Sequence, residues 1–183
     1  ITMSSLHNNC PIGAVTFDGN ITFSCVPKAG KNQAMMLLSQ FEKKDSKKTI
    51  GSALNNALRG AEKLLKKCSL VVIISDFRTS DWIDSFGRLC QKNDVLAIRI
   101  SDPLDERLPS VGSVPFVDPE TDNLCVLPTS SSKFSEAWKK ENEQRVANWK
   151  ADCLRHGGIP LIMSTAKDPA AELIKFFTSR ERT

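Results

Sequence analysis

Two acidic residues, Asp76 and Asp102, each follow an apolar run and are the residues of this chain best placed for chemistry. The runs cover residues 70–74 and 95–100, and one short amphipathic segment joins them. A run that is apolar on both faces is typical of a strand in a parallel α/β sheet, covered on both sides by helices. Ligands of open α/β sheets bind at the carboxyl ends of the strands. We therefore expect any ligand of this chain to bind beside Asp76 and Asp102.

Three further charged residues, Asp105, Glu106 and Arg107, follow Asp102 closely. Asp102 precedes Pro103, and an Asp-Pro pair is typical of the start of a turn. One interpretation is an exposed ion-pair cluster that only holds the loop in place. The other is a docking surface for a partner protein, because loops held by a rigid sheet often carry function. Both interpretations stay open, and Asp102, Asp105, Glu106 and Arg107 are the candidate partner-binding residues.

Two hairpins are predicted around the buried strands. In the first, β-type runs at residues 13–17 and 21–26 flank Asp18-Gly19-Asn20, which is a strong turn signal. The second is a proline-rich surface insert with β-type runs at residues 113–117 and 124–127.

Helices are predicted where apolar residues recur at three- and four-residue spacing. Thr79 or Ser80 is expected to cap the helix that joins the two buried strands. A last strand at residues 159–164 precedes a final helix, whose inward residues are expected to be Leu173, Ile174, Phe176 and Phe177. In chain order, the predicted helices cover residues 32–43, 50–65, 82–90, 132–156 and 168–182.

Composition limits the function. Six cysteines are scattered without a CxxC pair and only two histidines occur, so zinc sites, redox motifs and histidine-based hydrolases lack parts. Scattered cysteines in an α/β chain are typical of reduced thiols in the cytosol. The net charge of +4 lacks an aromatic platform for nucleic acid, and no apolar run approaches the roughly 18 residues of a membrane span. We expect a cytoplasmic protein that contacts neither nucleic acid nor membrane through these residues.

Length and hydrophobic content predict a single domain over residues 1–183. The chain begins with Ile1 rather than Met, so we expect it to be truncated at its N-terminus relative to a longer protein.

The order of these elements resembles a von Willebrand factor A-like domain. It is most similar to the domain of a widespread bacterial family of unknown biochemical function, usually found with MoxR-type AAA+ ATPases. The resemblance implies a three-layer, doubly wound, mostly parallel α/β sheet of Rossmann-like type, with an antiparallel edge hairpin and a small hairpin insert. The segments that carry it are Val15-Thr16-Phe17, residues 49–54, 72–77, 102–112 and 118–121, Ser164-Thr165 and Asp168-Pro169.

The resemblance implies a metal-ion-dependent adhesion site, which is built from a DxSxS sequence, a Thr and an Asp. Thr49 matches the Thr and Asp76 the Asp, and both side chains offer the oxygen ligands that Mg²⁺ prefers. The DxSxS sequence is absent from this chain. We favour structural roles for both residues, Thr49 as a helix N-cap and Asp76 as a cap or loop acceptor. No cofactor is therefore expected in this chain alone, and Mg²⁺ only if upstream residues complete the site.

The resemblance also implies that the first strand is missing from between residues 13–17 and 70–74. Each buried backbone group left unpaired there would cost about 1–3 kcal/mol. We expect the two flanking strands to close up, or residues 1–6 or a strand of a second chain to fill the position. The last arrangement would be self-association through the vacant strand position.

We predict a non-catalytic protein-interaction module that works with a MoxR-type AAA+ ATPase in protein or complex assembly. The alternative is a Rossmann-like enzyme that acts on a phosphorylated or nucleotide substrate at the carboxyl edge of the sheet. The chain lacks a GxGxxG or GxxxxGK[ST] loop and a recognisable nucleophile–base pair, so no catalytic residue is assigned.

Overall fold

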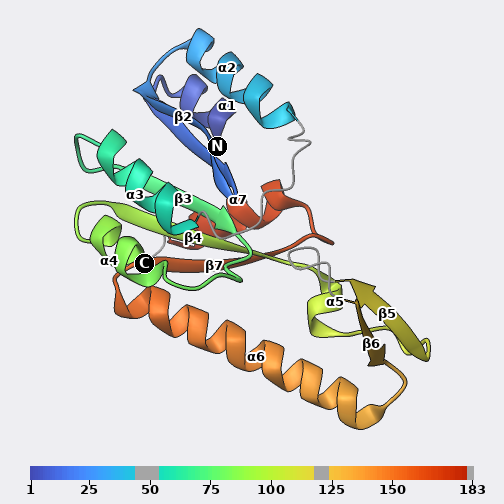
Figure 1. Cartoon of the computed structure of the whole chain (residues 1–183). Helices are drawn as coiled ribbons and strands as arrows, with labels where there is room; N and C mark the ends of the chain where they lie inside the picture. The colour runs from blue at the N-terminus through green and yellow to red at the C-terminus, as the bar shows by residue number, and fades with distance from the viewer. Residues whose placement is uncertain (44–53, 118–123, 181–183) are drawn as a thin grey trace. The chain divides into compact units, whose positions relative to one another are not determined.

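The computed structural model describes residues 1–43, 54–117 and 124–180, drawn in colour in Figure 1. The chain divides into two compact units that alternate along the sequence. Unit 1 consists of Ile1–Ser69 and Thr79–Asn93, and unit 2 of Leu70–Arg78 and Asp94–Thr183. No helix in the described part of the chain is long and apolar enough to cross a membrane.

Unit 1 contains the predicted N-terminal hairpin. Strand β1 (Ile12–Asp18) pairs antiparallel with β2 (Asn20–Lys28), and Gly19 at the turn has φ 64°, which a glycine adopts without strain. The two strands form a separate two-stranded sheet within the described residues. The expectation that this hairpin is an edge of the parallel sheet is therefore wrong.

The helices of unit 1 pack with the hairpin and with one another. Helix α3 contacts β1, β2 and α4, and it buries Leu54, Ala57 and Leu58. Trp82 and Phe86 meet edge to face, with ring centroids 5.3 Å apart. The four helices are α1 (Thr2–His7), α2 (Lys31–Glu42), α3 (Leu54–Leu64) and α4 (Ile83–Cys90).

Two expectations for unit 1 are corrected. Residues 1–6 were expected to be available as a strand, but most of them lie in α1. Helix α4 starts at Ile83 with Trp82 as its N-cap residue, so neither Thr79 nor Ser80 caps it. The reason is Asp81, whose φ of 64° places a left-handed turn between those hydroxyls and the helix.

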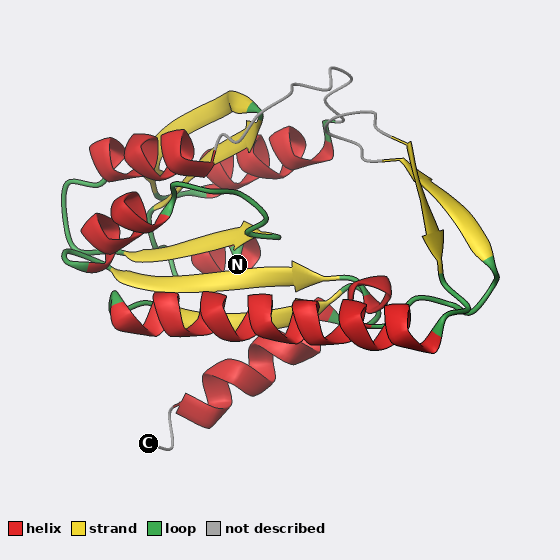
Figure 2. Cartoon of the chain, turned by 60° about the horizontal axis from the view of Figure 1, so that its bottom comes forward, coloured by secondary structure: helices red, strands yellow, loops and turns green. Residues whose placement is uncertain are grey.

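Unit 2 contains the predicted parallel sheet. Strand β4 (Asp94–Ser101) is central and pairs in parallel with β3 (Leu70–Ser75) on one side and β7 (Ile159–Ser164) on the other. The register places Ser75 beside Arg99, and Ser101 beside Ser164. Figure 2 shows the long helix α6 (Ser132–Arg155) running alongside this sheet.

Helices cover both faces of the sheet in unit 2. Leu96 and Ile98 on β4 pack with Leu173 and Phe176 of α7 (Pro169–Arg180). Arg99 instead lies over the ring of Trp149 on α6. Because successive strand residues point to opposite faces, α6 and α7 lie on opposite sides, and unit 2 has three layers.

Helix α7 corrects one predicted inward face. Leu173 and Phe176 pack against the sheet core as expected. Ile174 and Phe177 were also expected to face inward but are exposed. Each lies about 100° further round the helix than its packed neighbour, because a helix has 3.6 residues per turn.

The connection after β4 contains two further elements of unit 2. A short helix, α5 (Pro103–Glu106), follows the strand directly and was not predicted. The predicted hairpin insert is confirmed as β5 (Ser113–Val117) paired antiparallel with β6 (Leu124–Pro128).

Strand β3 is an edge strand within the described residues, where it pairs with β4 alone. Leu70 and Ile74 on β3 are 58% and 55% exposed. The expected closure of residues 13–17 against residues 70–74 is not found among the described residues, where β1 pairs with β2 and β3 pairs with β4. Filling of this position by a strand of a second chain stays a prediction.

Candidate functional site at the carboxyl end of the parallel sheet

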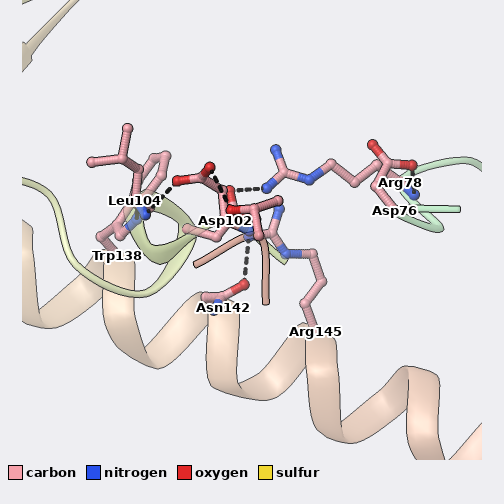
Figure 3. A network of polar contacts seen from close by, with 9 residues as sticks. Asp76, Arg78, Asp102, Leu104, Trp138, Asn142 and Arg145 are labelled. Carbon is pink, nitrogen blue, oxygen red and sulfur yellow. Dashed lines mark hydrogen bonds and ion pairs between the residues drawn. The ribbon is translucent and has the colours of Figure 1, made fainter. Parts of the chain in front are cut away.

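The carboxyl ends of β3 and β4 bring the predicted acidic residues into one region of unit 2. Asp76 follows β3 and Asp102 follows β4, as the sequence predicts. Figure 3 shows Arg78 extending from the loop after β3 toward α5, while Trp138, Asn142 and Arg145 reach the same region from α6.

Asp102 fixes the position of α5. Its Oδ1 accepts a hydrogen bond from the Leu104 backbone N–H at 2.9 Å, and Asp105 Oδ2 accepts one from the Asp102 N–H at 3.2 Å. This reciprocal pair is a capping box, which satisfies the first N–H groups of the helix. Thr165 Oγ1 donates to Asp102 Oδ2 at 3.1 Å, so the same carboxylate also holds the loop after β7.

Two more contacts hold α5 from other elements. The Arg78 guanidinium forms an ion pair with Asp105, which joins the loop after β3 to α5. Trp138 Nε1 on α6 donates to the Leu104 carbonyl oxygen at 3.3 Å. The Arg78 side chain is 39% exposed, so the ion pair alone contributes no more than about 1 kcal/mol.

The loop after β3 is tightly turned. Asp76 Oδ1 accepts from the Arg78 N–H at 3.2 Å, which is the predicted role of a loop acceptor. Phe77 between them has φ 53°, a conformation that costs a non-glycine residue of the order of 1–3 kcal/mol. The Phe77 ring is buried against Trp149, with centroids 5.3 Å apart, and this burial offsets the strain.

The structure separates the four candidate partner-binding residues into two kinds. Asp102 and Asp105 are occupied by the capping box, Thr165 and Arg78, as in the interpretation of a loop-holding cluster. Glu106 and Arg107 are exposed at the end of α5. Partner binding by any of the four stays a prediction.

The described residues do not by themselves fit a metal ion. They contain no group of three or more His, Cys, Asp or Glu side chains placed to hold one. Asp76 offers a single exposed carboxylate, whereas Mg²⁺ requires near-octahedral oxygen coordination. Thr49, the other predicted ligand, lies outside the described residues.

A groove of about 480 Å³ lies beside α5. Leu104, Leu108 and Pro109 supply apolar surface, and Arg107 supplies a positive charge. The other wall is rich in hydroxyl groups from the segment that leads into α6: Thr129, Ser130, Ser131, Ser132 and Ser135.

Comparison with known proteins shows the family. Residues 1–148 match the family described as protein of unknown function DUF58. The chain belongs to this family. The DUF58 match covers the whole of unit 1 and part of unit 2, and it ends within α6, before β7 and α7.

Relatives of this DUF58 chain are found in mycobacteria. An uncharacterized protein of Mycobacterium avium is 31% identical over 129 residues, which cover 69% of this chain and 73% of the relative. Uncharacterized proteins of Mycobacterium bovis and Mycobacterium tuberculosis are each 31% identical over 135 residues, and the match spans 39% of their length. No solved structure matches the chain.

Two polar residues near this site were not identified as candidates from the sequence of the DUF58 chain. Arg99 was counted within the apolar run of residues 95–100, yet its side chain is buried on the α6 face of the sheet. Asn142 is buried on α6 and accepts a hydrogen bond from Arg145 at 3.3 Å. Two features of the sequence could have identified these residues. Arg99 is a single charge within an apolar strand, and Asn142 is an amide at helical spacing from Trp138.

The charge of Arg99 is held in an unfavourable environment. Burial lowers the pKa of its guanidinium, and the positive charges of Arg145 and Arg78 lower it further. Asp105 and Asp76 act in the opposite direction but do not reverse the shift. The charged form of Arg99 is therefore disfavoured first by its burial and then by two neighbouring arginines.

Proposed function

We propose that this chain is a non-catalytic protein-interaction module, of von Willebrand factor A-like fold, that works with a MoxR-type AAA+ ATPase in protein or complex assembly. The observation that carries the proposal is α5, a short helix held firmly at the carboxyl edge of the sheet with exposed side chains beside a groove.

The first support is the way α5 is held. Contacts from Thr165, Arg78 and Trp138 reach it from three separate elements, in addition to its own capping box. A surface that is already ordered loses less conformational entropy when a partner binds. A rigid platform of this kind suits recognition of a partner.

The second support is the composition of the exposed surface. Leu104 is 52% exposed, and the charged side chains of Glu106 and Arg107 lie next to it. The adjoining groove combines apolar surface with hydroxyl groups. A few apolar anchors surrounded by polar groups are typical of protein interfaces.

The third support concerns the carboxylates. General acid–base catalysis needs a titratable group within hydrogen-bond reach of the substrate. Asp102 and Asp105 already use their oxygens to hold α5, which favours a structural role for them. Asp76 remains as the exposed carboxylate on which the alternative of a Rossmann-like enzyme depends.

Charge reversal at Arg107 tests the proposal. Calorimetric titration of the chain with a MoxR-type ATPase of the same organism should give measurable binding. Arg107→Glu should weaken it at least about tenfold, equivalent to about 1.4 kcal/mol. The matched control is Lys175→Glu, the same charge reversal on α7 across the sheet from α6, and it should bind like the wild type.

Two results would count against the proposal. Equal affinities of wild type and Arg107→Glu would remove α5 from the interface, and absence of any binding to the ATPase would remove the named partner. Turnover of phosphoester or nucleotide substrates that is lost in Asp76→Ala would support the enzyme instead.

A further inference from the structure

Two buried hydrogen-bond donors of unit 2 have no acceptor. They are Arg99 Nε and Trp149 Nε1, and among the described residues they are the buried side-chain nitrogen and oxygen atoms without a partner. Arg99 is 3% and Trp149 4% exposed. Buried polar groups in native proteins nearly always have a partner, so two orphaned donors together require an explanation.

The two donors belong to one place in the fold. Arg99 lies on β4 and Trp149 on α6, and Arg99 Cζ is 5.9 Å from the centroid of the Trp149 ring. Phe77 packs on the same tryptophan and fixes its ring. Since both free groups are N–H donors, whatever completes the site must be a hydrogen-bond acceptor.

The charge of the surroundings indicates an anionic acceptor. Arg99, Arg78 and Arg145 contribute three positive charges, against the two negative charges of Asp76 and Asp105. Arg78 and Asp105 form an ion pair with each other, which leaves Arg99 and Arg145 opposite Asp76. A buried water molecule would accept the hydrogen bonds but, being neutral, would not offset the buried charge of Arg99.

We propose that Arg99 and Trp149 form a binding site for a single carboxylate group, assisted by the positive charge of Arg145. One oxygen of a carboxylate can accept from the Arg99 Nε–H and the other from the Trp149 indole N–H. Arg78 and Arg145 are themselves exposed. The carboxylate comes either from an acidic side chain of a protein or from a small free acid.

This inference goes beyond the interaction proposed for α5 and does not depend on it. The ATPase and Arg107 are not involved, so either proposal can fail while the other holds.

Indole N–H resonances provide the test. The chain has three tryptophans, Trp82, Trp138 and Trp149, and a Trp149→Phe variant identifies the signal of Trp149 in a ¹H–¹⁵N spectrum. Titration with sodium acetate, against sodium chloride at equal ionic strength, should move the Trp149 signal along a saturating curve. The Trp138 signal should stay in place, because its N–H already donates to Leu104.

Variants assign the response to the site. Arg99→Met keeps the length of the side chain but removes its charge, and it should abolish the acetate response. Arg145→Met, at an exposed position, should weaken the response several-fold. Arg155→Met on the same helix is the matched control and should respond like the wild type. Unchanged Trp82 and Trp138 signals in each variant show that the fold is kept.

A blocked glutamate, N-acetylglutamate with an amidated backbone carboxyl, distinguishes the two sources. Tighter binding of this probe than of acetate would indicate a protein side chain, and tighter binding of acetate a small free acid. The proposal is overturned if neither probe moves the Trp149 signal, if chloride moves it equally, or if the response persists in Arg99→Met. A response of Arg145→Met equal to the wild type would also contradict the charge argument.

Discussion

Asp102 shows how much structure one carboxylate can organise. Its two oxygens accept from Leu104 of α5 and from Thr165 after β7, and the residue directly follows the central strand. An N-cap of this kind contributes about 0.5–2 kcal/mol. Because the same residue positions α5, its substitution would alter the proposed docking surface together with stability.

Cys90 gives a pH dependence at the scale of one residue. Burial raises the pKa of this α4 thiol from 9.0 to about 11. Between these values the thiol ionises in the unfolded chain but stays protonated in the folded one, so the unfolded state binds fewer protons and stability falls as pH rises. The contribution is fully present below pH 9 and is lost towards pH 11.

Denaturant unfolding of wild type and Cys90→Ala from pH 8 to pH 11 measures this effect. The wild type should lose more stability across pH 9–11 than the variant does. Cys68→Ala, which removes an exposed thiol, should follow the wild type. The same loss of stability in Cys90→Ala as in the wild type would show that the thiol is not its source. The chain has no tyrosine, so that group adds nothing to the alkaline titration.

Single residues near the site were predictable only in part. Asp76 and Asp102 were found because each follows a buried run, and strand ends are visible in the sequence. The Arg78–Asp105 ion pair joins segments 27 positions apart, and sequence spacing carries no signal for such a contact. Thr165 was named as part of a segment that carries the resemblance. Its hydrogen bond to Asp102 was not predicted, because that contact depends on β4 and β7 being parallel neighbours.

Among the elements, those with a strong pattern were predicted and short ones were missed. The three parallel strands and both hairpins were recognised from apolar runs and turn residues. Helices α1 and α5 have six and four residues, too few for helical periodicity to show. Pairing between β1 and β3 was expected from resemblance alone, and it is not found among the described residues.

The edge of β3 that has no ladder partner in the described part of the chain leads to a prediction about association. Unpaired strand edges that expose apolar residues pair readily with another strand. We expect the chain to self-associate reversibly through this edge as its concentration rises. Ile74→Lys places a charge on the exposed strand and should raise the dissociation constant at least about tenfold, or about 1.4 kcal/mol.

Sedimentation velocity over a series of concentrations measures this association. Val126→Lys is the matched control, because Val126 is similarly exposed but lies on β6 of the hairpin insert. A wild-type chain that stays monomeric throughout, or equal weakening by both substitutions, would contradict association through β3.

At the scale of the whole molecule, the two units share one interleaved chain. The chain passes from unit 1 to unit 2 after Ser69, back after Arg78, and again after Asn93. The two segments of unit 1 are joined only through β3, which belongs to unit 2. We therefore expect the units to unfold together, as the single domain predicted from the sequence would.

The indole N–H resonances of Trp82 and Trp149 report on the unfolding of the two units separately, because Trp82 belongs to unit 1 and Trp149 to unit 2. Both signals should disappear at the same denaturant concentration. Leu37→Ala, in the core of unit 1, should cost about 2–5 kcal/mol and lower both midpoints equally. Two separate midpoints, with only that of Trp82 lowered by the substitution, would show two independent domains.

The interleaved order also governs how the sheet of unit 2 is completed during synthesis. A ribosome releases roughly 5–20 residues per second, and the chain emerges from its N-terminus. Strand β3 therefore leaves the ribosome before its partner β4, and β4 waits for β7 until the hairpin insert and the whole of α6 have been translated. During that interval the apolar residues of a nascent β4, which end buried on both faces, are without their cover. The growing chain is thus open to chaperones and proteases from the emergence of β4 until α7, which covers Leu96 and Ile98, has also been translated.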